Sequence, residues 1–139
     1  MDNQEDALFT TCEESIARHR RFFRVAVIVA PLAYCLFIAL IGSGVERWFI
    51  ALFFMCGLVG IMLLNGYRMV IGVRIYEDRL VIITPLSETS SSWEQIRVSY
   101  FFGRLDIYTK GAGWPYMLSR WRKQDRQATK LIRDKIRSL

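Results

Sequence analysis

The sequence has few of the side chains that usually carry out chemistry. Among its 139 residues are one histidine, three cysteines and three prolines. The cysteines stand far apart, at Cys12, Cys35 and Cys56, and form no Cys-x-x-Cys pair. Ligands so dispersed do not predict a zinc site or a disulfide framework. No glycine-rich loop of the P-loop or dinucleotide type is present either, so we expect neither a metal nor a cofactor.

The remaining candidates for catalysis lack suitable neighbours. His19 lies in a run of arginines, with nothing in the sequence to aim it at a substrate. The serines at positions 90–92 have no base nearby in the sequence, whereas a catalytic nucleophile needs one in contact. Glu77 and Asp78 fall in an expected tight turn, where acidic residues are common for conformational reasons. The sequence therefore predicts no catalytic residue and no enzyme.

Charge is absent from two long segments, Val25–Val45 and Trp48–Tyr67, which only Glu46 and Arg47 separate. Each is about as long as the helix that crosses roughly 30 Å of hydrocarbon. Residues 25–67 are therefore predicted to form a transmembrane hairpin. Residues 1–24 precede it as a strand and a juxtamembrane helix, and residues 68–139 follow it as a small domain. The lack of ionisable residues within either span argues against transport.

The basic residues beside these segments predict their orientation. No Lys or Arg occurs in residues 1–17, but Arg18, Arg20, Arg21 and Arg24 stand directly before the first span. The short connection between the spans carries only Arg47. Lys and Arg are enriched in cytoplasmic flanks, so both termini are expected in the cytoplasm. The first span begins too late for an ordinary signal peptide.

Small residues suggest how the two spans would pack. One helix has Ala26, Ala30 and Ala33 on one face, and the other has Cys56, Gly57 and Gly60. Small faces allow helix backbones to approach closely in a membrane. Because the connection is so short, we expect the two faces to pack against each other within one molecule rather than in a dimer. Pro31 is expected to kink the first helix.

After residue 68 the pattern changes to short segments rich in Val and Ile, which predict strands. We expect an antiparallel meander of about five strands, followed from Ser119 by an amphipathic helix. Residues 7–10 are expected to add an edge strand, and Thr11–Glu14 has the form of a capping box for the first helix. The fold class is thus membrane α+β. The expected core residues of the domain are Trp93, Trp121, Leu131, Ile132 and Ile136.

Three short motifs resemble the YcxB-like family of small bacterial membrane proteins. They are Phe9–Glu14 before the first span, Ser92–Ile96 around a tryptophan, and Tyr116–Arg120 before the last helix. Ser119 stands where a proline is common in that family. The resemblance covers nearly the whole chain, and it implies a pleckstrin-homology-like domain, which is a bent sheet capped by a C-terminal helix. It implies a location in the inner membrane of a bacterial cell, and it implies no catalytic residues.

The excess of positive charge offers two interpretations. Residues 68–139 contain 14 basic and 7 acidic residues, a net charge of +7. The basic flanks either orient the hairpin or bind anionic lipid or a partner. The candidate surface consists of Arg18, Arg20, Arg21, Arg24, Arg120, Arg122, Lys123 and Arg126. A nucleic-acid interface is not expected, because Trp121 belongs to the apolar stripe of the last helix and its charges to the solvated face.

Three functions fit this architecture. The first is an inner-membrane-anchored binding or regulatory protein that presents its small domain to a protein or lipid at the cytoplasmic face. The second is an immunity protein that neutralises a membrane-acting or cytoplasmic toxin. The third is an accessory subunit of a larger membrane complex, in which the small faces of the spans contact other subunits.

Overall fold

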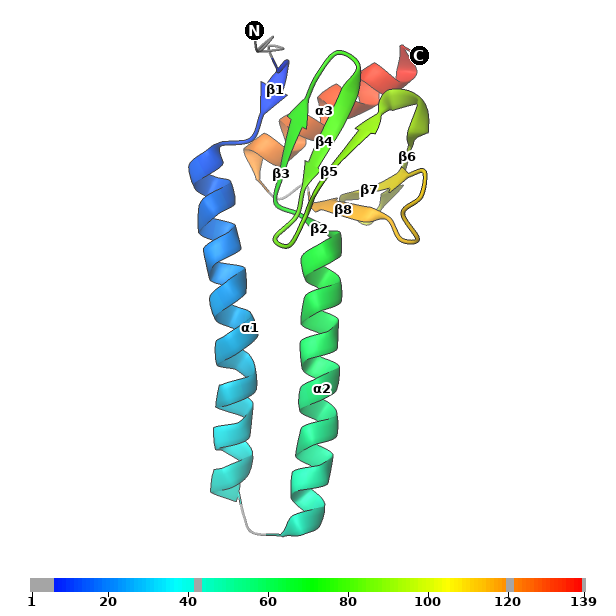
Figure 1. Ribbon diagram of the computed structural model, residues 1–139. Coiled ribbons are helices and arrows are strands. Elements are labelled where there is room, and N and C mark those ends of the chain that lie inside the picture. Colours follow the sequence, from blue (N-terminus) through cyan, green and yellow to red (C-terminus); the bar gives the residue numbers. More distant parts are fainter. Residues whose placement is uncertain (1–6, 42–43, 120–121, 139) are drawn as a thin grey trace, which may run out of the picture.

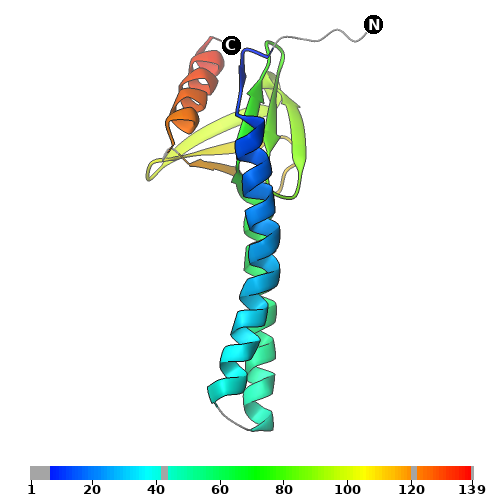
Figure 2. The same ribbon diagram turned by 90° about the vertical axis from the view of Figure 1, so that its left-hand side faces the viewer.

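The computed structural model describes residues 7–41, 44–119 and 122–138. Two long antiparallel helices stand side by side, with a sheet domain at one end of the pair (Figure 1). The helices are α1 (Glu13–Ile41) and α2 (Val45–Arg68). Helix α1 begins and α2 ends next to the sheet domain, and this end is called the domain end below. The view turned by 90° shows the same arrangement (Figure 2).

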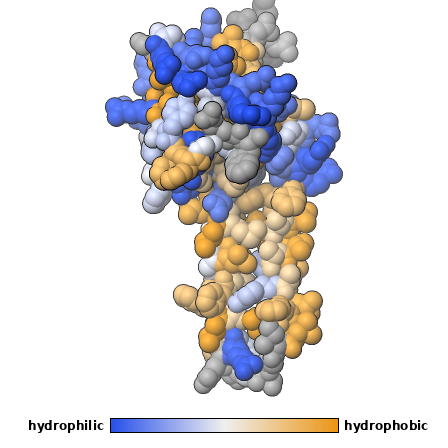
Figure 3. Space-filling view, turned by 180° about the vertical axis from the view of Figure 1, so that it is seen from behind, coloured by the Kyte–Doolittle hydropathy of each residue, from blue (hydrophilic) through white to orange (hydrophobic). Residues whose placement is uncertain are grey.

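Both helices are long and apolar enough to cross a membrane, which confirms that part of the prediction. Their apolar side chains point outward, with Leu40 78% exposed and Phe53 77% exposed. The space-filling view accordingly shows hydrophobic surface along the pair and mostly hydrophilic surface over the domain (Figure 3). A helix buried in the core of a soluble protein would not leave such residues bare. Helix α1 continues through Pro31 without ending.

The helices contact each other through a different face from the one predicted. Ala51 of α2 is 6% exposed, and the Sγ of Cys35 lies 3.4 Å from the Sδ of Met55. Gly57 and Gly60 are exposed, and a Cβ added to either would meet nothing within 4 Å. At about 100° per residue, Gly60 lies on the side of α2 opposite Ala51 and Gly57 about 120° away from Ala51.

The predicted packing of the two small faces is therefore wrong. Half-buried Ala26 and Ala30 do lie on the inward side of α1, but Ala33 and Cys56 are exposed. Ala51, Cys35 and Met55 lie in the contact instead.

The domain contains two four-stranded sheets and a helix. The first sheet has the order β1-β3-β4-β5, comprising β1 (Phe9–Thr10), β3 (Gly72–Ile75), β4 (Arg79–Ile83) and β5 (Glu88–Ser92). The second has the order β2-β8-β7-β6, comprising β2 (Met69–Val70), β8 (Tyr116–Ser119), β7 (Arg104–Thr109) and β6 (Ile96–Phe101). A short 3-10 helix, η1 (Trp93–Gln95), joins β5 to β6, and α3 (Lys123–Arg137) follows β8.

The helix-plus-sheet layout is confirmed, but the single antiparallel meander is wrong. Strands β2 and β8 are parallel, with Met69 opposite Met117 and Val70 opposite Leu118. Residues 69–75 are divided at Ile71, so that Met69–Val70 and Gly72–Ile75 belong to different sheets. A pattern of Val and Ile residues shows that a segment is extended but not which strand it pairs with.

The core lies between the two sheets and α3. It includes Leu80 and Ile82 from the first sheet, Leu105 and Ile107 from the second, and Ile132 from α3, all 0% exposed. Burying one such side chain contributes about 1.5–3 kcal/mol. This core is what allows so small a domain to hold its shape.

The residues predicted to form the core differ in how deeply they are buried. Trp93 is 4% exposed, and its Nε1 donates a hydrogen bond to the carbonyl of Tyr76 at 3.2 Å. Trp93 and Ile132 are confirmed as core, and half-buried Ile136 packs against it. Leu131 is 40% exposed, so its prediction is wrong. One step along a helix turns a side chain by about 100°, away from the face that Ile132 presents. Trp121 lies outside the described residues.

The start of α1 is fastened to the first sheet. Strand β1 pairs with β3 as the expected edge strand. The Thr11 hydroxyl accepts a hydrogen bond from the Val73 N–H and donates one to the Val73 carbonyl, so the predicted capping box is wrong. Beyond it, buried Ile16 packs on the outer face of the sheet over Gly72.

The end of α2 is fastened to the second sheet. Arg68 is the last residue of α2 and Met69 the first residue of β2, so the helix enters the sheet without a linker. The two helices thus reach the domain through two different sheets. Because each attachment uses backbone pairing, the domain is held in one orientation relative to the helices.

Candidate anion-binding site at the domain end of the helices

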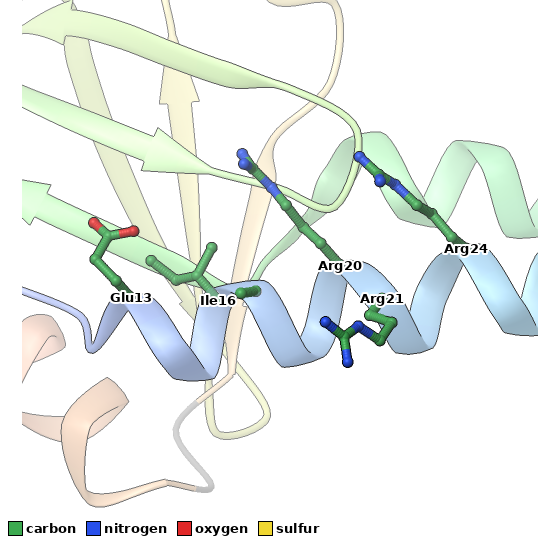
Figure 4. Close-up of a pocket in the computed structure, with 6 residues that line it drawn as sticks. Glu13, Ile16, Arg20, Arg21 and Arg24 are labelled. Atoms are coloured by element: carbon green, nitrogen blue, oxygen red, sulfur yellow. The ribbon is translucent and has the colours of Figure 1, made fainter.

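The arginines of α1 form a shallow pocket where the helix leaves the domain. The pocket has a volume of about 310 Å³ and is lined by Glu13, Ile16, Ala17, Arg20, Arg21 and Arg24. Arg20 and Arg24 are four residues apart and extend in the same direction, toward the loop between β4 and β5 (Figure 4). Arg21 points to the other side of the helix (Figure 4). Two guanidinium groups one helical turn apart suit an anion that accepts several hydrogen bonds.

Two carboxylates near this pocket are already engaged by another arginine. Arg74 of β3 binds Glu13 through Nη2 at 2.8 Å and Glu88 through Nη1 at 2.7 Å. The hydrogen bond from Arg74 to Glu13 raises the pKa of Arg74, which therefore stays charged. Arg20 reaches Glu88 only at 3.9 Å. Its Nε is shielded from solvent, but its side chain is 34% exposed and lines the pocket.

The other arginines of α1 differ in their pairing. Arg18 contacts Glu14 one turn away at 2.9 Å, but both side chains are at least 75% exposed. Such an exposed pair contributes little. Within the described residues, no carboxylate lies within 4.0 Å of Arg21 or Arg24. The positive charge is therefore least compensated at Arg21 and Arg24, next to the apolar part of α1.

The basic residues of the last helix are only partly brought to this site. The Nη1 of Arg122 lies 3.5 Å from the hydroxyl of Ser15 on α1. Lys123 and Arg126 are exposed on α3 and have no described contact with α1. Arg120 lies outside the described residues. Of the predicted basic surface, the structure thus places the arginines of α1 together, and Arg122 lies beside the first turn of that helix.

Asp125 is the titratable group that the sequence reasoning missed. It is 7% exposed in the first turn of α3, and burial raises its pKa. Arg122, with its Nε 3.7 Å away, opposes this increase in pKa, and His19 opposes it more weakly. An acidic residue in the first turn of a helix is a common capping signal, and this signal was available in the sequence.

The residues considered for catalysis make local contacts. The Nδ1 of His19 lies 2.6 Å from the carbonyl of Ser15, within α1. The serines at 90–92 form most of β5, and Asp78 contacts Arg79 at 3.4 Å beside the turn. Among the described residues, no group of three or more His, Cys, Asp or Glu side chains is placed to hold a metal.

Comparison with known proteins adds no relative to these observations. No family model, no curated protein and no solved structure matches this chain.

Proposed function

We propose that the protein is a non-enzymatic binding protein anchored in the bacterial inner membrane. In this proposal α1 and α2 cross the membrane as a hairpin, both termini are cytoplasmic, and the sheet domain lies at the cytoplasmic face. The charge distribution supports this orientation. The arginines of α1 stand at the domain end, whereas Arg47 lies beside the connection at the opposite end. Positive charge of this kind is retained on the cytoplasmic side.

The proposal extends to the family and the fold. Membership of the YcxB-like family, and with it a pleckstrin-homology-like domain, agrees with two sheets enclosing one core with a C-terminal helix against them. The direct entry of α2 into β2 also suits a domain held at a membrane surface.

We further propose that the ligand is the phosphate of an anionic lipid headgroup, bound at the pocket on α1. The observation that carries this choice is that Arg20 and Arg24, one turn apart, line the same pocket and extend in the same direction (Figure 4). Both stand where α1 would enter the bilayer, which is the level of the lipid phosphates. Each basic residue near an anionic membrane contributes about 1 kcal/mol.

The test compares two triple variants of the full chain, each of which removes three positive charges. One is R20A/R21A/R24A at the pocket, and the other is K110A/K130A/R137A, which removes exposed residues elsewhere on the domain. Binding of phosphatidylglycerol and cardiolipin to the protein in mild detergent is measured by native mass spectrometry.

The pocket variant is expected to lose lipid affinity by more than about tenfold, since three such charges contribute about 3 kcal/mol. The control is expected to lose much less. Equal losses in the two variants would contradict a defined site. A stoichiometric protein in place of lipid would favour the accessory-subunit or immunity function.

A further inference from the structure

Three loops of the sheet domain carry exposed apolar side chains that the core does not use. Leu86 stands between β4 and β5, Phe101 and Phe102 at the turn between β6 and β7, and Trp114 between β7 and β8. Their exposed fractions are 38%, 52%, 93% and 65%. Solvent-exposed large hydrophobic groups that gather on one side of a small domain mark an interaction surface.

Two of these loops lie against the last turn of α2. The Cδ1 of Leu86 is 2.9 Å from where a Cβ on Gly66 would stand, and Phe23 of α1 also contacts this position. The guanidinium carbon of Arg68 lies 5.3 Å from the centre of the Trp114 ring, and its Nε donates to the carbonyl of Pro115 at 3.5 Å. Leu86 and Trp114 are therefore at the level where α2 would leave the hydrocarbon.

The third loop projects sideways at a similar level. Figure 2 shows the hairpin of β6 and β7, in yellow, reaching out beside the blue first turns of α1. The rings of Phe101 and Phe102 meet edge to face at 4.6 Å, and the guanidinium of Arg104 lies 5.4 Å from the Phe101 ring. The tip of this hairpin is thus an apolar group with a cation beside it.

The backbone of this turn gives a second reason to assign it a role. Phe102 has φ +40° and Gly103 has φ +77°, and tight hairpin turns of this kind favour Asn or Asp before the glycine. A phenylalanine in the left-handed region is strained. The strained backbone and the exposed ring of Phe102 are both unfavourable in water. A surface that covered the ring would offset this cost.

We infer that these three loops rest in the interface of the same bilayer that α1 and α2 cross. This inference depends on the proposed membrane topology and goes beyond it, since it assigns a second membrane contact to residues outside the spans. Aromatic rings with neighbouring arginines suit the boundary between hydrocarbon and headgroups. The attachments of α1 and α2 to the two sheets hold the loops at a fixed depth.

The experiment places one fluorescent label at a time on the full chain in lipid nanodiscs. The native cysteines are replaced (C12S/C35A/C56A), and single cysteines are introduced as F102C at the tip, E77C at the exposed turn between β3 and β4, or F53C on the exposed side of α2. Each label is quenched by iodide from water or by lipids that carry a nitroxide near the headgroup.

At position 102 we expect iodide quenching about threefold lower than at position 77, together with strong quenching by the nitroxide lipid. Equal iodide quenching at 102 and 77 would overturn the inference. The label at position 53 separates the two claims. If it is shielded from iodide while the label at 102 is not, the hairpin spans the membrane but the loops do not touch it. If the label at 53 is also open to iodide, the proposed topology itself fails.

Discussion

Thr11 and Val73 are joined by three hydrogen bonds, although 62 positions separate them in the sequence. The Thr11 hydroxyl accepts from the Val73 N–H at 2.9 Å and donates to the Val73 carbonyl at 3.2 Å. The N–H of Thr11 donates to the same carbonyl at 3.0 Å. These bonds fix the residue from which the chain enters α1, so the first helix and the first sheet behave as one unit.

Thr11→Ala is expected to lower the free energy of unfolding by about 1–3 kcal/mol, because the Val73 N–H is left buried without a partner. Thr11→Ser keeps the hydroxyl and is expected to lose much less. Denaturant titration of the protein in mild detergent measures both. Equal losses in the two variants would show that the methyl group matters rather than the hydrogen bonds.

Gly72→Ala is expected to lower stability by about 1–3 kcal/mol through overpacking. A Cβ on Gly72 would stand 2.8 Å from both Cγ1 and Cδ1 of Ile16. Gly113→Ala is the control, because a Cβ there meets nothing within 4 Å. The shortened side chain in Ile16→Val is expected to recover part of the loss when combined with Gly72→Ala. If the stability losses of Gly72→Ala and Ile16→Val simply add in the double variant, this contact is contradicted.

Ile132→Ala is expected to cost about 2–5 kcal/mol, as for other fully buried aliphatic residues. Leu131→Ala removes a side chain that is 40% exposed and is expected to cost less than half as much. Thermal unfolding of the two variants under identical conditions provides the comparison. A larger loss at position 131 would mean that α3 is rotated relative to the orientation described above.

Asp125→Asn is expected to raise stability at neutral pH. Burial raises the pKa of Asp125, so its charged form is disfavoured in the folded protein. Between the ordinary carboxyl pKa, about 3.9, and the raised one, the folded protein holds a proton that the unfolded chain has released. The contribution of Asp125 to the free energy of unfolding therefore falls as the pH rises through this window, and it is constant above the window.

The advantage of Asp125→Asn is thus expected to disappear as the pH is lowered toward about 4. Asp134→Asn is the matched control, because Asp134 is exposed on the same helix. Unfolding midpoints from pH 4 to 7 measure both variants. A lower midpoint for Asp125→Asn at neutral pH would show that its pairing with Arg122 outweighs the cost of burial.

The sequence predicted those features that depend on local composition. Two uncharged apolar segments were sufficient to predict α1 and α2, and the edge position of Phe9 and Thr10 followed from a short apolar segment before a helix. The burial of Trp93 was also predicted. Each of these features depends on a few neighbouring residues, and therefore the sequence pattern reveals it directly.

The features that were missed depend on pairing between distant segments. The parallel pairing of Met69 with Met117 places β2 in the second sheet while β3 belongs to the first, and the local pattern does not encode it. At the candidate site, the arginines of α1 were predicted, but the engagement of Glu13 and Glu88 by Arg74 was not. Strand pairing brings position 74 near position 88, so Arg74 contacts Glu88 at 2.7 Å whereas Arg20 reaches it only at 3.9 Å.

The most direct test of the account maps which end of the hairpin faces the outside of the cell. In the background C12S/C35A/C56A, a single cysteine is placed by G44C beside the connection between the helices or by E77C in the sheet domain. Intact cells are treated with a membrane-impermeant maleimide. We predict that position 44 is labelled in intact cells and that position 77 is labelled only after lysis. Labelling of position 77 in intact cells, with position 44 protected, would contradict the account.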